Sequence, residues 1–142
     1  MEPAFKFEHR ITYSECTVGN HVYYSRYLDI LETARGELFR SAGFPLLQLQ
    51  ENGIAFPVIE VKIAYKGPAR YDDVVTVALW INEMRGIRLS FGFQIFHGSG
   101  QILAEGETRH ICASLDEKPK RLAAELIERF NPFVRAVQHD AG

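Results

Sequence analysis

The sequence feature that most constrains the fold is a run of four strand-like segments that follows a single long helical segment. Within residues 24–42, apolar side chains recur at every third or fourth position, which predicts an amphipathic helix of about 19 residues. Further on, apolar and polar residues alternate with a period of two, as in half-buried β-strands. These strand segments cover residues 59–65, 75–81, 87–95 and 101–115. Because short turns join the strands, the order predicts an antiparallel α+β domain.

The ends of these elements are marked by residues that favour turns. Gly43 and Pro45 follow the long helix, one suited to a helix C-terminus and the other unable to continue the helix. An alternating segment at residues 5–13 predicts a further strand ahead of the helix. Residues 44–53 are expected to form a loop or a short helical turn, and a short helix is expected from residue 120 up to Asn131-Pro132.

One helix cannot cover the apolar face of a sheet of this size. The economical arrangement is a curved antiparallel sheet wrapped around the helix, with the remaining apolar surface and an open sheet edge covered by a second copy of the chain. We therefore expect a homo-oligomer, either a homodimer or a homotetramer. The sequence contains no internal repeat or linker, so residues 1–142 are expected to form a single domain.

Composition and charge exclude several classes of function. A formal net charge of -2 argues against nucleic acid as the main partner, because phosphate binding needs a dominant basic surface. No apolar run approaches the roughly 20 residues of a membrane span, and the first residues do not resemble a signal peptide. The two cysteines, Cys16 and Cys112, are too few for a disulfide framework and fit a reducing compartment. A cytoplasmic location is therefore the expectation.

The polar loop at residues 15–20 leads directly into the long helix, and we expect the chemistry at this junction. The start of a helix presents unpaired backbone N–H groups and the positive end of the helix dipole. A substrate oxygen that gains negative charge would be stabilised there.

Three segments of the chain also resemble a known family, and they occur in the order in which that family has them. They run from Tyr13 to Arg35, from Tyr65 to Asp73 and from Glu83 to Phe91. Together they closely resemble the hot-dog-fold acyl-CoA thioesterases, and most of all the 4-hydroxybenzoyl-CoA thioesterase branch, which includes the thioesterase associated with the bacterial Tol-Pal cluster. The resemblance extends over nearly the whole chain. It implies the hot-dog fold, a curved antiparallel sheet around one long central helix.

The resemblance also implies which residues lie at the active site. In this branch the loop usually reads Asp-x-Asp, and its second Asp is the catalytic carboxylate. Glu15 corresponds to the first Asp and Thr17 to the second, so the usual catalytic carboxylate is replaced by Thr17. The backbone N–H of the residue that matches Tyr24 polarises the thioester carbonyl in these enzymes. The alternative for Tyr24 is an ordinary uncapped helix terminus.

Several side chains of the loop are candidates for handling the attacking water. The hydroxyl of Thr17 is a poor base and is better suited to orienting water, or it packs within the loop without a catalytic part. His21 is the best general base by chemistry, because histidine is the residue type suited to proton transfer near neutral pH, although it also fits a substrate-orienting or structural role. Glu15 is either the displaced carboxylate or, more in keeping with the family, the residue that organises the loop. Cys16 is expected to pack, since no cation in the loop would lower its pKa.

The phosphates of coenzyme A call for basic side chains at the surface. Two groups are candidates, Arg85 and Arg88 in a predicted hairpin, and Lys118 and Lys120 after the last strand; solvated surface charge is the alternative for each. The acyl group would lie along the helix in an apolar slot. The candidates for this slot, which are otherwise ordinary core residues, are Phe44, Leu47 and Phe56.

The remaining polar residues fit structural roles better than catalytic or metal-binding ones. Glu32 precedes Arg35 by three positions, a spacing that allows an ion pair on the helix. His9, His97 and His110 lie on separate strands without metal-ligand spacing, so we expect neither a metal nor a redox cofactor.

The function implied is hydrolysis of an acyl-CoA thioester to the free acid and coenzyme A, with coenzyme A as part of the substrate. A competing interpretation is a non-catalytic protein that binds acyl-CoA, or an acyl carrier protein thioester, and has lost the carboxylate. Hydration of an enoyl thioester on the same fold ranks lower, because the usual Asp/His pairing is missing. The sequence leaves open the acyl group, the carrier, and the choice between dimer and tetramer.

Overall fold

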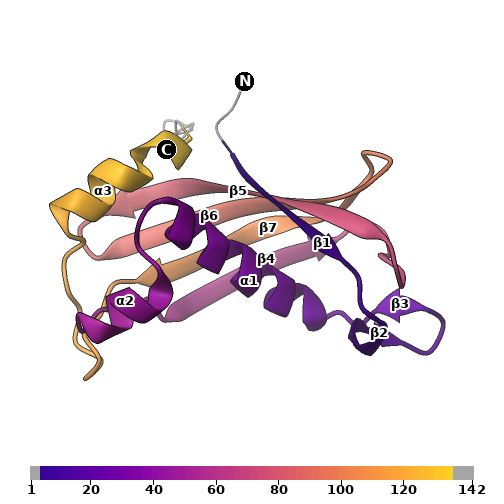
Figure 1. The fold of residues 1–142 in the computed structure, drawn as a ribbon, viewed down its shortest axis with the longest axis horizontal. Helices are drawn as coiled ribbons and strands as arrows, with labels where there is room; N and C mark the ends of the chain where they lie inside the picture. The colour runs from indigo at the N-terminus through magenta and orange to yellow at the C-terminus, as the bar shows by residue number, and fades with distance from the viewer. Residues whose placement is uncertain (1–3, 136–142) are drawn as a thin grey trace.

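The computed structural model describes residues 4–135 and contains a five-stranded antiparallel sheet with one long helix packed across one face (Figure 1). The sheet order is β1-β5-β6-β7-β4. Its strands are β1 (Phe5–Arg10), β4 (Val58–Tyr65), β5 (Val74–Arg85), β6 (Arg88–His97) and β7 (Ile102–Ile111). The helices are α1 (Arg26–Ser41), α2 (Leu46–Glu51) and α3 (Ala124–Phe130), and a small hairpin consists of β2 (Cys16–Thr17) and β3 (His21–Val22). Short 3-10 turns occupy Tyr13–Glu15 and Asn131–Phe133.

Helix α1 confirms the central prediction from the apolar spacing. Its buried side chains face the sheet and form one stripe, comprising Tyr27, Ile30, Leu31, Ala34, Leu38 and Phe39. The helix is shorter than the expected span at its start, because residues 23–25 form a turn in which the Arg26 N–H donates to the Tyr23 carbonyl at 2.8 Å. It ends just before Gly43, whose φ of 90° lies in the left-handed region.

Two strands are shorter than the segments predicted for them, residues 5–13 and 101–115. Strand β1 stops at Arg10 because the chain then turns, and the Ile11 N–H donates to the Asp73 carbonyl at 2.8 Å. Strand β7 stops at Ile111, where the next residue leaves the ladder and the Cys112 N–H donates to the Ile87 carbonyl at 2.7 Å. Alternation of apolar residues therefore continued beyond the paired segments in both cases.

Gly106 of β7 lies where the neighbouring strand leaves no room for a side chain. A Cβ atom at this position would lie 1.9 Å from the Lys62 carbonyl oxygen, on the neighbouring strand β4. Gly106→Ala should therefore lower the free energy of unfolding by roughly 3 kcal/mol, because backbone atoms must move apart to admit the methyl group. Urea unfolding of the variant and the wild type measures this difference in the free energy of unfolding. Gly100→Ala is a poor comparison because of its positive φ, whereas Gly98→Ala is suitable, since its Cβ would approach nothing closer than 3.7 Å. Equal stability of Gly106→Ala and Gly98→Ala would contradict the prediction.

Strand β4 forms one edge of the sheet, and its apolar side chains are more exposed than a half-buried strand would have them. Ile59 is 58% exposed, Val61 38% and Tyr65 45%, although their alternation predicted a buried face. Among residues 4–135, β4 pairs with β7 on one side and with no strand on the other. An apolar strand with one free edge is a surface on which another strand can pair.

Candidate active site

The loop between β1 and α1 folds back on itself as the β2–β3 hairpin. The Asn20 N–H donates to the Thr17 carbonyl at 3.0 Å, and Gly19 provides the positive φ, 94°, that this turn requires. The Asn20 side-chain oxygen accepts a hydrogen bond from the Tyr71 N–H at 3.0 Å. The Val22 N–H donates to the Ala69 carbonyl at 2.9 Å, so the hairpin is held against the β4–β5 connection.

The hairpin brings together Thr17 and His21, two of the residues that the sequence suggested for handling water. The two residues are directly opposite in the antiparallel β2–β3 pairing, so their side chains share one face. Both are exposed. Thr17 also borders an open hollow of about 600 Å³ whose walls include Tyr13 and Tyr71. The rings of these tyrosines meet edge to face with centroids 5.6 Å apart, and this gives the hollow an aromatic wall.

Glu15 is engaged within the loop. Its carboxylate accepts a hydrogen bond from the Thr12 N–H at 2.7 Å and lies 2.9 Å from Nε2 of His9. Burial raises the pKa of this carboxyl, but the bonds from Thr12 and His9 together outweigh burial, and the net pKa lies below 4.5. These bonds favour the interpretation in which Glu15 organises the loop, since a carboxylate with fixed partners is less free to activate water.

Tyr24 presents an unused backbone donor at the start of α1. Its N–H has no hydrogen-bond acceptor within residues 4–135, whereas the N–H of its neighbour Tyr23 donates to the Glu15 carbonyl at 2.9 Å. The Tyr24 carbonyl accepts from the hydroxyl of Tyr65 at 2.9 Å, which holds this peptide in place. Tyr24 as a whole is 61% exposed.

The four basic residues predicted for coenzyme A belong to the β5–β6 turn and to the segment after β7, and this turn lies at the opposite end of the sheet from the β2–β3 hairpin (Figure 1). Arg85 and Arg88 pair across the β5–β6 turn, and the segment carrying Lys118 and Lys120 is tied to this turn by a hydrogen bond from the Leu122 N–H to the Gly86 carbonyl, 2.9 Å long. The hairpin contacts the chain just before Val74, at the far end of β5. A strand of this length separates the two groups by about 35 Å.

Arg88 lines a second hollow of about 250 Å³. The other residues lining it include Glu60, Glu83, Arg109 and Ile59 of the edge strand. Arg88 therefore lies close to the free edge of the sheet.

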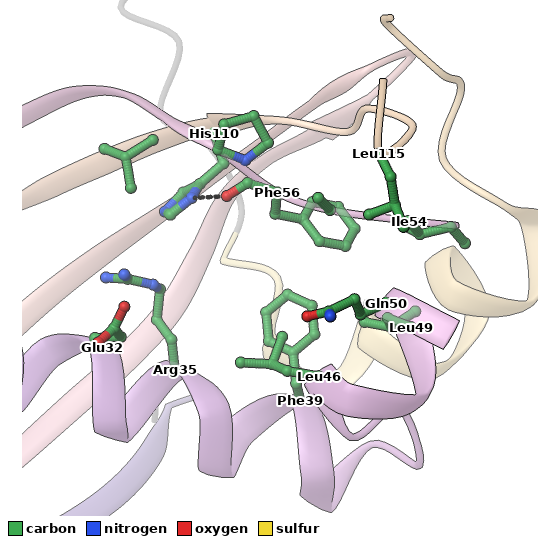
Figure 2. Close-up of a pocket in the computed structure, with 13 residues that line it drawn as sticks. Glu32, Arg35, Phe39, Leu46, Leu49, Gln50, Ile54, Phe56, His110 and Leu115 are labelled. Atoms are coloured by element: carbon green, nitrogen blue, oxygen red, sulfur yellow. Dashed lines mark hydrogen bonds between the residues drawn. The ribbon is translucent and has the colours of Figure 1, made fainter. Parts of the chain in front are cut away.

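Another pocket lies between α1, α2 and the ends of β4 and β7 (Figure 2). It encloses about 380 Å³, which is within the range of ligand pockets. The residues lining it are Glu32, Arg35, Phe39, Leu46, Leu49, Gln50, Ile54, Ala55, Phe56, Pro57, Val58, His110 and Leu115. Most of these side chains are apolar, and the charged ones gather at the end nearer the start of α1 (Figure 2).

His110 is buried in the wall of this pocket, with 3% of its surface exposed. Its Nδ1 lies 3.1 Å from the Phe56 carbonyl, which can only accept, so Nδ1 carries the proton and Nε2 accepts from the Thr108 hydroxyl at 3.0 Å. Burial and then the positive charge of Arg35 lower the pKa of His110 to about 4, while the bond to Phe56 opposes them. The imidazole is therefore neutral at pH 7 and both its nitrogens are occupied.

The depressed pKa of His110 makes stability depend on pH. Because the folded-state value of about 4 lies below the unfolded value of 6.5, the unfolded chain binds a proton first as the pH falls. The stabilisation is complete above pH 6.5 and is lost toward pH 4, by roughly 2.5 kcal/mol between pH 7.5 and 4.5. Urea unfolding of the wild type and of His110→Leu at these two pH values isolates the contribution of His110 to stability. An equal loss of unfolding free energy in both proteins would contradict the prediction.

Arg35 and Glu32 do not form the ion pair that their spacing allowed. No ion pair or hydrogen bond joins either side chain to another part of residues 4–135. Burial lowers the pKa of the half-buried Arg35, and the charge of Glu32 opposes this, so the two groups interact only at longer range. In Figure 2 the guanidinium of Arg35 lies between Glu32 and His110.

The pocket includes one of the three residues proposed for the acyl slot. Phe56 lines it, whereas the ring of Phe44 packs against Phe130 at 6.2 Å and Leu47 is 66% exposed on α2. The contributions of Arg35 and His110 to the pocket were not predicted from the sequence. For His110 a signal existed, since Thr108 and His110 alternate as two polar residues on the inward side of a strand, where apolar ones are usual.

Two negative observations apply to residues 4–135. None of the helices described there is long and apolar enough to cross a bilayer. In the same range, no group of three or more His, Cys, Asp or Glu side chains is arranged to hold a metal ion.

Comparison with known proteins places the chain in a family. The pattern of the family described as "Thioesterase-like superfamily" matches residues 11–137. The acyl-CoA thioester hydrolase YbgC of Escherichia coli is 31% identical over 127 residues, which cover 89% of this chain and 95% of the relative. A protein of Bacillus subtilis described as putative acyl-CoA thioesterase YneP is 29% identical over 107 residues, covering 75% of this chain and 78% of that one.

A solved structure shares the fold. The crystal structure of a 1,4-dihydroxy-2-naphthoyl-CoA thioesterase from Synechocystis superposes with a TM-score of 0.84, covering 90% of this chain and 96% of that one at 22% identity. The family match over most of the chain and this superposition agree with the resemblance of the three sequence segments. The chain therefore belongs to the thioesterase-like superfamily and has the hot-dog fold.

Proposed function

We propose that this protein is an acyl-CoA thioesterase that hydrolyses its substrate to a free acid and coenzyme A. The observation that carries the proposal is the free N–H of Tyr24 at the start of α1, next to the hairpin that holds Thr17 and His21. The names of the relatives, an acyl-CoA thioester hydrolase and a putative acyl-CoA thioesterase, support the same substrate class.

The proposed reaction begins with attack of water on the thioester carbonyl carbon. The Tyr24 N–H and the positive end of the α1 dipole stabilise the oxyanion that forms. Thr17 positions the water by hydrogen bonding, and His21 takes one of its protons as the carbon–oxygen bond forms. The carbon–sulfur bond then breaks, and the coenzyme A thiolate leaves and receives that proton. Glu15 keeps the loop in shape without entering the reaction.

An acyl-CoA molecule is too short to reach from the hairpin to the basic end of the same chain. Arg85, Arg88, Lys118 and Lys120 lie about 35 Å from the hairpin, as estimated from the length of β5. A second copy solves this problem, because pairing of two β4 edges in antiparallel fashion reverses the partner and places its basic end near this hairpin. Three strand spacings, roughly 15 Å, then separate the partner's β6 from the first chain's β4. We therefore propose a homo-oligomer in which the partner's basic residues hold the coenzyme A phosphates.

Other features of the proposal follow the sequence analysis. We propose that a single domain performs the reaction without a metal or a redox cofactor. We place the protein in the cytoplasm, where its free cysteines, Cys16 and Cys112, would stay reduced.

Release of free thiol from acyl-CoA tests the proposal. Short, long and aromatic acyl-CoAs are incubated with the protein, and thiol is measured against the rate without protein. We expect turnover of at least one class. If an acyl-CoA binds but none of the acyl-CoAs is hydrolysed, the protein is instead a non-catalytic acyl-CoA binding protein. The presence of Thr17 in place of the usual Asp favours this competing function.

The roles of Thr17 and His21 have separate tests. In Thr17→Ala and His21→Ala we expect kcat to fall about tenfold and about 100-fold, since orienting a water is worth less than accepting its proton. Rates that match the wild type in both variants would refute these roles. Thr17→Asp restores the usual carboxylate, and a rise in kcat would show that the same position still faces the reacting carbon.

A further inference from the structure

His9 is the polar member of an otherwise apolar row on β1. Phe5, Phe7 and His9 alternate with exposed residues, and the two phenylalanines pack against the hydrophobic core. The side chain of His9 is 22% exposed, and its Nε2 lies 2.9 and 3.0 Å from the two carboxylate oxygens of Glu15. Because a carboxylate can only accept, Nε2 of His9 is the donor. His9 therefore joins β1 to the loop ahead of α1.

Glu15 continues this connection to the start of α1 through its main chain. The Glu15 carbonyl accepts a hydrogen bond from the Tyr23 N–H at 2.9 Å. A planar peptide joins Tyr23 to Tyr24, so a displacement of Tyr23 also moves the Tyr24 N–H. On the far side of that N–H, the Tyr65 hydroxyl donates to the Tyr24 carbonyl at 2.9 Å. Glu15 and Tyr65 thus hold the chain before and after the proposed oxyanion donor.

His9 and Thr12 hold the carboxylate of Glu15 within residues 4–135. The bond from the Thr12 N–H is 2.7 Å long and belongs to the same short turn as Glu15, so it shapes the turn but moves with it. His9 lies on a strand whose six residues all pair with β5, and its own partner is the buried Val75. The bond from His9 therefore fixes the turn relative to the sheet.

We propose that His9 is a positioning residue of the active site, which sets the place of the Tyr24 N–H through Glu15. The ring of His9 contacts neither substrate nor water in this role. It keeps the Glu15 carbonyl where the Tyr23 N–H can reach it, and the next N–H along the chain then faces the thioester carbonyl. This inference rests on the proposed function, because it takes the Tyr24 N–H as the oxyanion donor.

Two amide substitutions of different reach test the inference. The side-chain nitrogen of Gln matches the position of Nε2 in histidine, whereas the nitrogen of Asn is attached closer to the main chain and falls short of Glu15. In His9→Asn we expect kcat for acyl-CoA hydrolysis to fall about 30-fold at an unchanged KM, because a displaced oxyanion donor weakens the transition state more than substrate binding. In His9→Gln the bond to Glu15 is restored, and kcat should stay within about threefold of the wild type.

His97→Asn is the matched control. His97 pairs with the other side of Val75 in the ladder, is also half-buried, and faces the carboxylate of Asp73 at 3.5 Å instead of that of Glu15. We expect His97→Asn to keep the kcat of the wild type. A fall in His97→Asn as large as that in His9→Asn would overturn the inference.

Hydrogen exchange of the Tyr23 amide, followed by NMR, measures the same link without any activity. In His9→Asn this amide should exchange about tenfold faster than in the wild type, because the carbonyl that accepts its hydrogen bond is no longer held. The amide of Val77, a buried residue of β5, should exchange as in the wild type. If His9→Asn does not fold, His9→Leu, which also lacks the donor, provides the same comparison.

A double variant tests whether His9 acts through Glu15. In a Glu15→Ala background the further change His9→Asn should leave kcat unchanged, because the bond that it removes is already absent. A further fall of about 30-fold would overturn the inference, because His9 would then act by another route.

The inference and the proposed function fail in different ways. If the Tyr23 amide responds as predicted but the wild type hydrolyses no acyl-CoA, the link from His9 to the helix start stands and the thioesterase assignment falls. If acyl-CoA is hydrolysed and His9→Asn keeps both the wild-type kcat and the wild-type exchange of Tyr23, the assignment stands and the role of His9 falls.

Discussion

Replacing Tyr24 by proline should reduce kcat by about 100- to 1000-fold, the cost of losing one oxyanion donor. Proline has no N–H, so the variant removes the single backbone donor proposed to face the thioester carbonyl. The Tyr24 N–H makes no hydrogen bond within residues 4–135, so no contact of the described protein is lost with it. Steady-state thiol release over a range of substrate concentrations separates the fall in kcat from any change in KM.

A matched variant separates the backbone from the side chain. Tyr24→Ala removes the exposed ring but keeps the N–H, and we expect it to retain most of the wild-type kcat. The circular dichroism and melting temperature of Tyr24→Pro should stay near those of Tyr24→Ala, which shows that α1 still begins correctly. A folded Tyr24→Pro enzyme with a kcat close to that of Tyr24→Ala would contradict the proposed donor.

A charge on the edge strand should separate the subunits and remove most of the activity. Val61 is apolar and 38% exposed on β4, where the proposed second copy would cover it. In Val61→Glu we expect a monomer of 16.2 kDa, because burial of two opposed carboxylates across a symmetric interface is costly. The kcat/KM for acyl-CoA should fall about 100-fold, since the partner's charge-assisted phosphate contacts, together worth about 3 kcal/mol, are lost.

Sedimentation of the purified proteins checks the oligomeric state, and thiol release checks the activity. Leu47→Glu is the matched control, because Leu47 is also apolar and is 66% exposed, but it lies on α2 away from the edge strand. We expect the control to keep both the wild-type mass and the wild-type rate. A Val61→Glu protein that stays oligomeric, or a monomer with full activity, would show that the site does not depend on this edge.

The sequence predicted the fold closely, because the pattern that determines it is local. Spacing of three and four gave α1, and alternation gave β4, β5, β6 and β7. The predictions were less accurate where tertiary contacts end an element. Ile11 turns away from β1 to bond Asp73, and Cys112 leaves β7 to bond Ile87, and neither event has a local signal.

The candidate site was only partly predictable, and the reason is again distance along the chain. Thr17 and His21 were both candidates from the sequence, and their roles stay predictions; the hairpin that places them opposite each other was not predicted. The pocket of Arg35 and His110 joins residues 75 positions apart, so only the folded sheet brings them together. Sequence also could not reveal that Arg85 and Arg88 lie at the far end of β5 from the hairpin.

The measurement that tests the account most directly is the activity of a mixed pair of subunits. One subunit carries Tyr24→Pro and the other carries Arg85→Ala with Arg88→Ala, and two affinity tags isolate pairs that contain one of each. If the helix start of one chain works with the basic end of its partner, each pair keeps one intact site and about half of the wild-type rate. If each chain holds a complete site, both sites in the pair are damaged, and the mixed pair will be no more active than the mean of its two parent variants.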